Sequence, residues 1–226
     1  MSVLAAEGIG LSLDGKRILE SISHTFRRGR VTALLGPNGA GKSTLLDCLA
    51  ALRKPDDGAA TLDGQDVQRI DRRVRARAIG LLPQAADVHW NIDVATLVGL
   101  GRLPHRGRWG ETAADRDAVA RALAATDMTG LADEPLASLD PGHQLDVLAR
   151  LRSIADAGSG VVLVLHDLHL AARVADDAVL LRGGRVVAAG PADEVLTAPL
   201  IAEAYGVDVE IGLTPAGHRF ILPIAR

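Results

Sequence analysis

The sequence predicts an α/β fold with an added antiparallel piece, and three observations support it. First, a continuous apolar run at residues 31–35 leads through a glycine-rich loop into a helical run at residues 44–52. Second, residues 161–165 form a continuous run of valine and leucine, which is typical of a parallel strand covered on both faces. Third, the chain begins with segments of strand character that a turn at Asp14-Gly15 separates.

The first part of the chain alternates strand and helix patterns after its strand-rich start. Asp, Gly and Pro turn signals surround a short strand between residues 55 and 64, and an arginine-rich stretch follows that we expect to be helical. An apolar strand ending at Pro83-Gln84 comes next. The expected strands are 4–13, 22–26, 31–35, 59–62 and 79–82, and the expected helix is 68–78.

The second part contains two amphipathic helices, a buried strand and a hairpin. Residues 85–110 hold no clear strand and several turn residues. Residues 178–181 and 185–189 indicate a hairpin around Gly183-Gly184, and a proline in the first turn favours a short helix at 191–197. The amphipathic helices are expected at 112–125 and 145–155.

The composition is that of a soluble globular protein with one domain or two closely joined subdomains. A hydrophobic fraction of 48% suffices for a sizeable core, and a net charge of −3 predicts no polyanionic partner. The single cysteine, Cys48, cannot form an internal disulfide, which fits a reducing compartment. We expect no signal peptide, because no basic start precedes a long apolar stretch, and no membrane span, because the longest strongly apolar run, residues 161–165, is far too short for a bilayer.

A basic cluster lies in the expected helix at residues 68–78. Nucleic-acid binding is one interpretation, but no aromatic residues interleave with the arginines and the whole chain is acidic. A solvated helix face is the favoured interpretation, so we expect no nucleic-acid partner. The arginines are Arg69, Arg72, Arg73, Arg75 and Arg77.

The loop after residues 31–35 carries the clearest chemical signal. Its sequence, GPNGAGKS, fits G-x-x-x-x-G-K-[ST], the phosphate-binding P-loop, with the strand before and the helix after that the motif requires. Glycines let successive N–H groups point at phosphate oxygens, and the helix adds its positive dipole. Lys42 supplies charge for the β- and γ-phosphates, and the Ser43 hydroxyl can bind Mg²⁺. The expected nucleotide-binding residues are Gly36, Pro37, Asn38, Gly39, Ala40, Gly41, Lys42, Ser43 and Thr44.

Two adjacent acids, Asp133 and Glu134, are the next candidates. A P-loop enzyme needs one carboxylate for the Mg²⁺ shell and often a second to orient or activate water. Asp133 would serve the metal and Glu134 the water, whereas a solvated acidic pair is the alternative. Three further polar residues occur in order along the chain after strands or turns: Gln84, Asp140 and His166.

This ordered set resembles the ATP-binding subunits of ABC transporters over nearly the whole chain. The matching segments are LLGPNGAGKSTLL (the Walker A loop), LLPQ (the Q-loop), LADEPLASLD (the Walker B end plus D-loop) and VLVLHD (the switch histidine). The resemblance implies that Gln84 links the metal site to a transmembrane partner, that Asp140 contacts an opposing subunit and that His166 touches the γ-phosphate. It implies Glu134, His166 and Gln84 as catalytic residues, and Ser43, Gln84 and Asp133 as Mg²⁺ ligands.

The same resemblance implies a P-loop NTPase core of the ABC type, with an antiparallel β subdomain and a truncated helical subdomain. The chain is then a single nucleotide-binding domain, with a catalytic core at 1–84 and 133–226 and a shortened helical subdomain at 85–132. ATP and Mg²⁺ are the implied cofactors. The implied partners are transmembrane permease subunits and a second ATP-binding subunit in a homodimer, and the implied location is cytoplasmic, peripheral on the inner face of the cell membrane.

Two further segments resemble one group within this family, the importers of metal chelates. They are TLVGLGRLPHRG at residues 96–107 and VLLRGGRVVAAGPADEVLTAPLIAEAYGVDV at residues 179–209. This resemblance implies import of an iron-siderophore, haem or cobalamin-like substrate, with the substrate chosen by other proteins.

The sequence departs from the family pattern at two places. The family stacks adenine on an aromatic residue upstream of the P-loop, and the matching position here is Leu13, which lacks a π face. The family also has a segment resembling LSGGQ before the Walker B carboxylates, and none occurs between Lys42 and Asp133. An internal deletion near residues 131–133 is our hypothesis for its absence. In a two-subunit ATP sandwich this signature segment presents N–H groups to the γ-phosphate, so its loss removes donors from both sites.

Three functions are compatible with these observations. The first is an ATP-hydrolysing subunit that drives a chelate importer. The second is a nucleotide-binding module with little or no hydrolysis, because the signature segment is absent. The third is a different P-loop enzyme, such as a nucleotide kinase or GTPase. It is disfavoured because no guanine-reading N-K-x-D is visible and Gln84, Asp140 and His166 would be unexplained.

Overall fold

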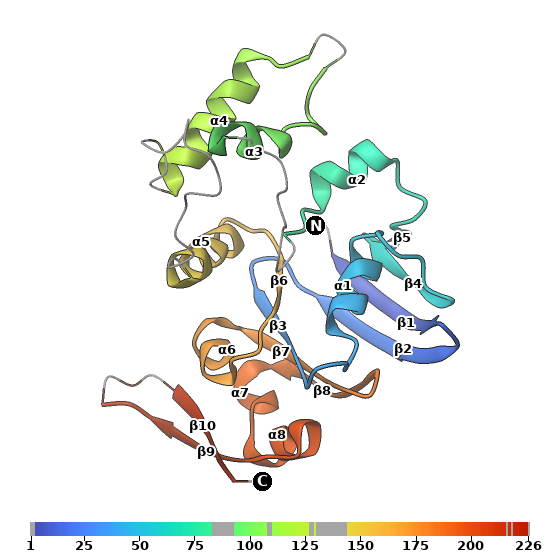
Figure 1. Cartoon of the computed structure of the whole chain (residues 1–226), viewed down its shortest axis with the longest axis vertical. Helices are drawn as coiled ribbons and strands as arrows, with labels where there is room; N and C mark the ends of the chain where they lie inside the picture. Colours follow the sequence, from blue (N-terminus) through green and yellow to red (C-terminus); the bar gives the residue numbers. More distant parts are fainter. Residues whose placement is uncertain are drawn as a thin grey trace. The chain divides into compact units, whose positions relative to one another are not determined.

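The computed structural model describes residues 3–82, 93–107, 110–126, 129, 144–215, 217 and 219–225. The chain divides into two compact units, one formed by Met1–Arg69 with Gln144–Arg226 and the other by Ile70–His143 (Figure 1). The subdomain boundaries predicted at residues 84/85 and 132/133 lie outside the described residues and stay a prediction. Among the helices of the described ranges, none is long and apolar enough to cross a membrane.

An antiparallel sheet with the order β2-β1-β4-β5 forms part of the first unit. Its strands are β1 (Leu4–Leu13), β2 (Lys16–Phe26), β4 (Asp57–Leu62) and β5 (Gln65–Asp66). The second strand begins well before the predicted residue 22, because Asp14 and Gly15 both have positive φ, at 50° and 76°. A two-residue turn of this kind matches the twist of the strands, so pairing continues up to Leu13 and Lys16.

A mixed sheet with the order β6-β3-β7-β8 lies in the same unit (Figure 1). Strand β3 (Val31–Leu35) is buried along its whole length and runs parallel to β6 (Val161–Val164) and β7 (Asp177–Arg182). Strand β8 (Arg185–Pro191) pairs antiparallel with β7 around the Gly183-Gly184 turn. The two predicted parallel strands and the predicted hairpin are confirmed, but β6 is buried at Val161 and half-buried along the rest of its length, because it lies at the edge of the described sheet and is not covered on both faces.

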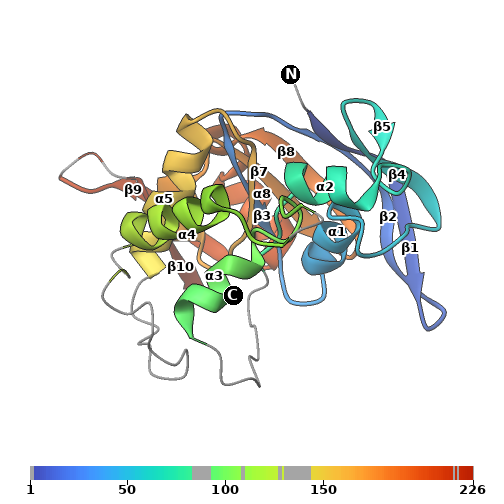
Figure 2. The same cartoon turned by 90° about the horizontal axis from the view of Figure 1, so that it is seen from above.

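Helices and a C-terminal hairpin complete this unit. Helix α1 (Lys42–Leu49) follows β3 and contacts the antiparallel strands β1 and β2 (Figure 2). The hairpin of β9 (Asp208–Leu213) and β10 (Arg219–Ala225) contacts α6 through β10. The other helices are α5 (Gln144–Asp156), α6 (Leu168–Val174), α7 (Ala192–Val195) and α8 (Ala198–Tyr205). The main core includes the fully buried side chains of Ala33, Leu35, Ala171, Leu180, Leu196 and Ile201.

In the second unit the described helices are α2 (Arg72–Ala78), α3 (Val94–Leu100) and α4 (Ala113–Ala125). Each begins at a side-chain cap, since Asp71, Asp93 and Thr112 accept hydrogen bonds from N–H groups of the first turn. Thr112 and Asp115 form a capping box. Hydrogen bonds from Thr112, together with Arg102, lower the pKa of Asp115 to about 2.

The prediction of a strand at residues 79–82 is wrong. These residues form no strand, and the Leu82 side chain is 78% exposed, whereas a buried parallel strand needs both faces covered. Helix α2 begins at Arg72 instead of residue 68, because Asp71 is its cap. Helix α3 was not predicted, although Asp93 three residues before Thr96 is a recognisable N-cap signal.

Charged side chains join the amino ends of β3 and β7. Arg30 forms a bidentate ion pair with Asp177, with N–O distances of 2.6 and 2.8 Å. Asp176 accepts a hydrogen bond from the Val31 N–H at 2.7 Å and another from Arg152 of α5 at 2.6 Å. One carboxylate therefore ties the start of β3 to α5, and its removal leaves a backbone donor without its partner.

We predict that Asp176→Ala lowers the free energy of unfolding by about 1–3 kcal/mol, because the Val31 amide and the Arg152 guanidinium lose a shared acceptor. Burial by itself raises the pKa of Asp176, but the hydrogen bonds from Arg152 and Val31 outweigh it and hold this pKa below its ordinary value of 3.8. The stabilisation is therefore present above that value and is lost as the pH falls through the lower folded-state pKa. Urea denaturation at neutral and at acidic pH measures both effects.

Asp156→Ala is the matched control, because the Asp156 carboxylate pairs with the same Arg152 but is 65% exposed. We expect this variant to lose at most about 0.5 kcal/mol. Equal losses for the two variants at neutral pH would show that the Val31 contact contributes nothing.

Candidate nucleotide-binding site

The loop at residues 36–43 joins the carboxyl end of β3 to the first turn of α1 (Figure 2). Gly41 is the N-cap of α1 in the left-handed conformation, with φ 98°, and no described side chain caps this helix. The first N–H groups of α1 are therefore left for another acceptor. Helix N-termini with this arrangement bind phosphate, because the free N–H groups and the helix dipole both favour an anion.

Close packing requires two of the loop glycines. Gly36 has φ 144°, and a Cβ at this position would lie 2.1 Å from the carbonyl oxygen of Leu181 on β7. A Cβ at Gly41 would lie 2.7 Å from the Leu19 side chain and 3.0 Å from the carbonyl oxygen of Ile18, both on β2. The backbones of β2 and β7 therefore set the path of the loop, and glycine permits both the approach and the positive φ.

Lys42 is almost buried, with 5% of its surface exposed. Its Nζ atom donates hydrogen bonds to the carbonyl oxygens of Gly36, at 2.7 Å, and Pro37, at 2.9 Å. Burial lowers the pKa of Lys42 because removal from water disfavours the charged form. These two carbonyls are neutral, and they are the hydrogen-bond partners of Lys42 among the described residues; an ammonium has three donors, so a third can bind a phosphate oxygen.

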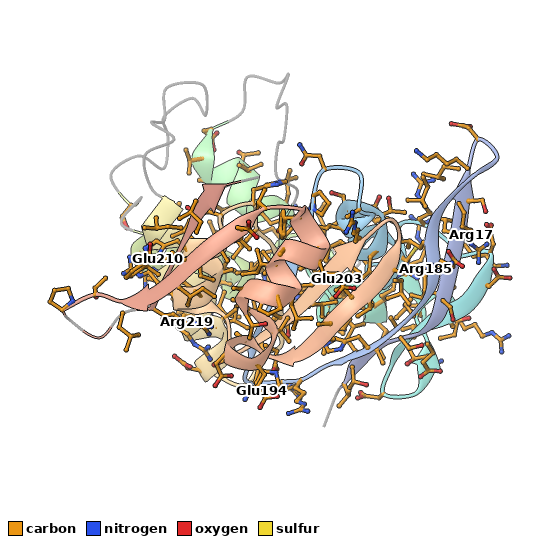
Figure 3. All side chains as sticks on the ribbon, turned by 90° about the horizontal axis from the view of Figure 1, so that it is seen from below. Arg17, Arg185, Glu194, Glu203, Glu210 and Arg219 are labelled. Atoms are coloured by element: carbon orange, nitrogen blue, oxygen red, sulfur yellow. The ribbon has the colours of Figure 1, made fainter. Side chains whose placement is uncertain are left out.

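The β7–β8 turn supports the loop. The Gly184 N–H donates to the carbonyl of Ala40 at 3.3 Å, and the Gly184 carbonyl accepts from the Glu20 N–H of β2 at 2.8 Å. An exposed ion pair between Glu20 of β2 and Arg185 of β8, at 2.5 Å, also joins the hairpin to β2; Figure 3 labels Arg185. The hydrogen bond from Arg185 lowers the pKa of Glu20. The loop thus has backbone contacts with the hairpin as well as with β3 and α1.

A tyrosine that no sequence pattern indicated also contacts the loop. Tyr205, the last residue of α8, accepts a hydrogen bond from the Gly36 N–H through its hydroxyl oxygen at 2.7 Å. Burial raises the pKa of Tyr205 above its ordinary value. Local sequence around residue 205 carries no sign of this contact, because it arises from the packing of α8 against β7 and β8.

His166 lies at the same edge of the sheet as the loop. Strands β3 and β6 are parallel, with Leu34 opposite Val164, so the residues that follow each strand emerge at the same end. His166 is exposed and comes two residues after β6. Ligands of open parallel sheets bind outside the carboxyl ends of the strands, and the loop and His166 each follow a strand at that edge.

The remaining predicted site residues lie outside the described residues: Gln84, Asp133, Glu134 and Asp140. Of the predicted Mg²⁺ ligands, Ser43 is described, and it is exposed in the first turn of α1. Asn38 and Gly39 are exposed in the loop. Leu13, the expected base-stacking position, ends β1 and is half-buried.

Known proteins resemble the chain over most of its length. Residues 19–151 match a family model described as ABC transporter. The chain is 36% identical to the hemin import ATP-binding protein HmuV of Pseudomonas entomophila, over 97% of this chain and 99% of that protein. It is also 36% identical to the cobalamin import ATP-binding protein BtuD of Halobacterium salinarum, over 94% of this chain and 61% of that protein.

Solved structures share the fold. A structure described as an inward-facing metal-chelate type ABC transporter matches with a TM-score of 0.82 at 19% identity, over 100% of this chain and 99% of that chain. A nucleotide-free ATP-binding cassette from an ABC transporter matches with a TM-score of 0.72 at 19% identity, over 84% and 92%. At these identities the likeness concerns the fold alone.

The alignment with the Pseudomonas relative runs over 257 positions, more than the 226 residues of this chain. That relative therefore contains residues with no counterpart here. The family model nevertheless spans more than half of the chain, and the relatives align over nearly all of it. The predicted fold class is confirmed, and the chain belongs to the ABC transporter family as one of its ATP-binding subunits.

Proposed function

We propose that this protein binds ATP with Mg²⁺ at residues 36–43 and couples ATP hydrolysis to the import of a metal chelate. The observation that carries the proposal is the position of Lys42, whose buried ammonium lies against the Gly36 and Pro37 carbonyls. The uncapped N-terminus of α1 begins at the same residue. One buried positive charge beside free helix N–H groups suits the β- and γ-phosphates of a nucleotide.

The proposed hydrolysis assigns each predicted residue a role. Ser43, Gln84 and Asp133 would hold Mg²⁺, for which hydroxyl, amide and carboxylate oxygens are suitable ligands, and the bound ion would supply positive charge for the phosphates. Glu134 orients a water and accepts its proton as the water oxygen bonds to the γ-phosphorus, and the bond from that phosphorus to the bridging oxygen breaks to give ADP and phosphate. His166 contacts the γ-phosphate in this proposal. Its position after β6, at the same edge of the sheet as the phosphate loop, supports this role.

The proposed substrate is an iron-siderophore, haem or cobalamin-like chelate. Support comes from relatives whose names state hemin or cobalamin import, and from the segments at residues 96–107 and 179–209. The proposed partners are transmembrane permease subunits and a second ATP-binding subunit. The protein would then lie on the inner face of the cell membrane, where Gln84 transmits the state of the metal site to the permease.

The alternative is a nucleotide-binding module with little hydrolysis, and it rests on the absent signature segment. We infer that the Pseudomonas relative contains this signature segment among the residues that have no counterpart in the present chain. The alternative is disfavoured because relatives named as import ATP-binding proteins align with nearly the whole chain.

We predict that Lys42→Ala raises the Kd for Mg·ATP by about tenfold to a hundredfold, because a charge-assisted hydrogen bond to phosphate is lost. Lys54→Ala is the control, since Lys54 is exposed and lies outside the loop. Isothermal titration calorimetry measures both. If the two variants bind alike, Lys42 does not belong to the site.

We also predict that Glu134→Gln abolishes steady-state ATP hydrolysis while it leaves Mg·ATP binding intact, because an amide cannot accept a proton from water. Glu194→Gln, at an exposed position in α7, should retain the activity of the unmodified protein. Phosphate release in the presence of the permease is the measurement. An unmodified protein that binds ATP and releases no phosphate would favour the alternative module instead.

A further inference from the structure

Helix α8 brings the chain's single tyrosine to the beginning of the phosphate loop. The helix is anchored by Ile201 and Ala204, which are buried in the same core cluster as Leu35 of β3, and Tyr205 packs against this cluster. Arg182 of β7 also donates a hydrogen bond to the backbone carbonyl of Glu203, which Figure 3 labels. The position of the Tyr205 ring is therefore set by the core that positions the end of β3.

The Tyr205 hydroxyl and the Lys42 ammonium contact the two successive peptide groups that meet at Gly36, the first residue of the loop. The Gly36 N–H donates to this hydroxyl at 2.7 Å, and the Gly36 carbonyl accepts from Lys42 Nζ at 2.7 Å. Gly36 is buried and packs against the Leu181 carbonyl, which restricts its position. The hydrogen bond fixes the plane of the peptide that joins Leu35 to Gly36, and the close approach of Gly36 to the Leu181 carbonyl limits the φ and ψ rotations by which the Gly36 carbonyl could turn away from Lys42.

We propose that Tyr205 is a positioning residue for the phosphate loop: its hydroxyl orients Gly36, and Gly36 in turn holds the Lys42 ammonium where the β- and γ-phosphates bind. The inference rests on the proposed function, in which Lys42 binds those phosphates. Because the core holds the Tyr205 hydroxyl in place, the loop already has its binding conformation before ATP arrives. The loop therefore loses less conformational entropy when ATP binds. Burial raises the pKa of Tyr205 above its ordinary value of 10, so the hydroxyl is neutral at physiological pH.

Tyr205→Phe tests the proposal because it removes the hydroxyl and retains the ring. We expect the Kd for Mg·ATP to rise about threefold to tenfold, as for the loss of one hydrogen bond whose donor stays buried. Calorimetry on the full chain, at a temperature well below the unfolding transition of each variant, gives this value.

Ile201→Val is the matched control for a purely structural effect. Ile201 lies on the same helix and is fully buried, and the substitution removes one methylene group without touching the loop. We expect it to lower the Tm and to leave the Kd for Mg·ATP unchanged. If Tyr205→Phe likewise lowers the Tm alone, or if Ile201→Val weakens ATP binding equally, the proposal fails.

A second measurement applies even where Tyr205→Phe does not fold. Because the chain has one tyrosine, growth with 3-fluorotyrosine gives a single ¹⁹F resonance from residue 205. At an Mg·ATP concentration near the Kd of the unmodified protein, we expect this resonance to shift in that protein and to move much less in Lys42→Ala, whose affinity is lower. A resonance that stays in place while calorimetry detects binding would overturn the role of Tyr205 alone. Absence of binding by the unmodified protein would overturn the proposed function as well.

Discussion

The path of the phosphate loop requires glycine at residues 36 and 41, because the Leu181 carbonyl excludes a side chain at Gly36 and the Leu19 side chain excludes one at Gly41. The Leu181 carbonyl of β7 lies against the first of these glycines, and the Ile18 carbonyl of β2 lies against the second. The loop is therefore held between the two sheets of the first unit, and the Lys42 ammonium lies inside it on two carbonyls. Nucleotide binding in this account depends on backbone geometry first and on the lysine second.

Ion pairs fix the amino end of β3, whereas its carboxyl end leads into the phosphate loop. At the amino end, the Arg30–Asp177 ion pair joins the strand to β7. Asp176 accepts a hydrogen bond from the Val31 amide and pairs with Arg152, which joins the strand to α5. At the carboxyl end, the strand opens into the loop, and His166 emerges from the parallel strand beside it. A strand fixed at one end and buried throughout keeps the other end rigid, which a preorganised phosphate site requires. The C-terminal residues belong to this arrangement, since α8 contacts the loop and β10 contacts α6.

The sequence predicted the parts of the fold that have strong local signals. Residues 31–35 and 161–165 are continuous apolar runs, and the structure has them as parallel partners. The phosphate loop could be predicted because all the residues of its motif lie within residues 36–43, between a strand and a helix that also have local signals. Tyr205 was not predicted, because its contact with Gly36 joins residues far apart in the chain and depends on how α8 packs. Residues 79–82 were predicted wrongly, because an apolar run alone does not specify a strand partner. The assignments of Gln84, Asp133, Glu134 and Asp140 stay predictions.

A glycine-selective ¹⁵N NMR titration with Mg·ATP tests most directly whether the loop amides hold the phosphates. We expect the resonances of Gly36, Gly39 and Gly41 to shift strongly, while those of Gly8 and Gly15, at β1 and its turn, stay in place. If the loop resonances do not move in a folded sample that binds ATP by calorimetry, the nucleotide binds elsewhere and the loop is not the phosphate site.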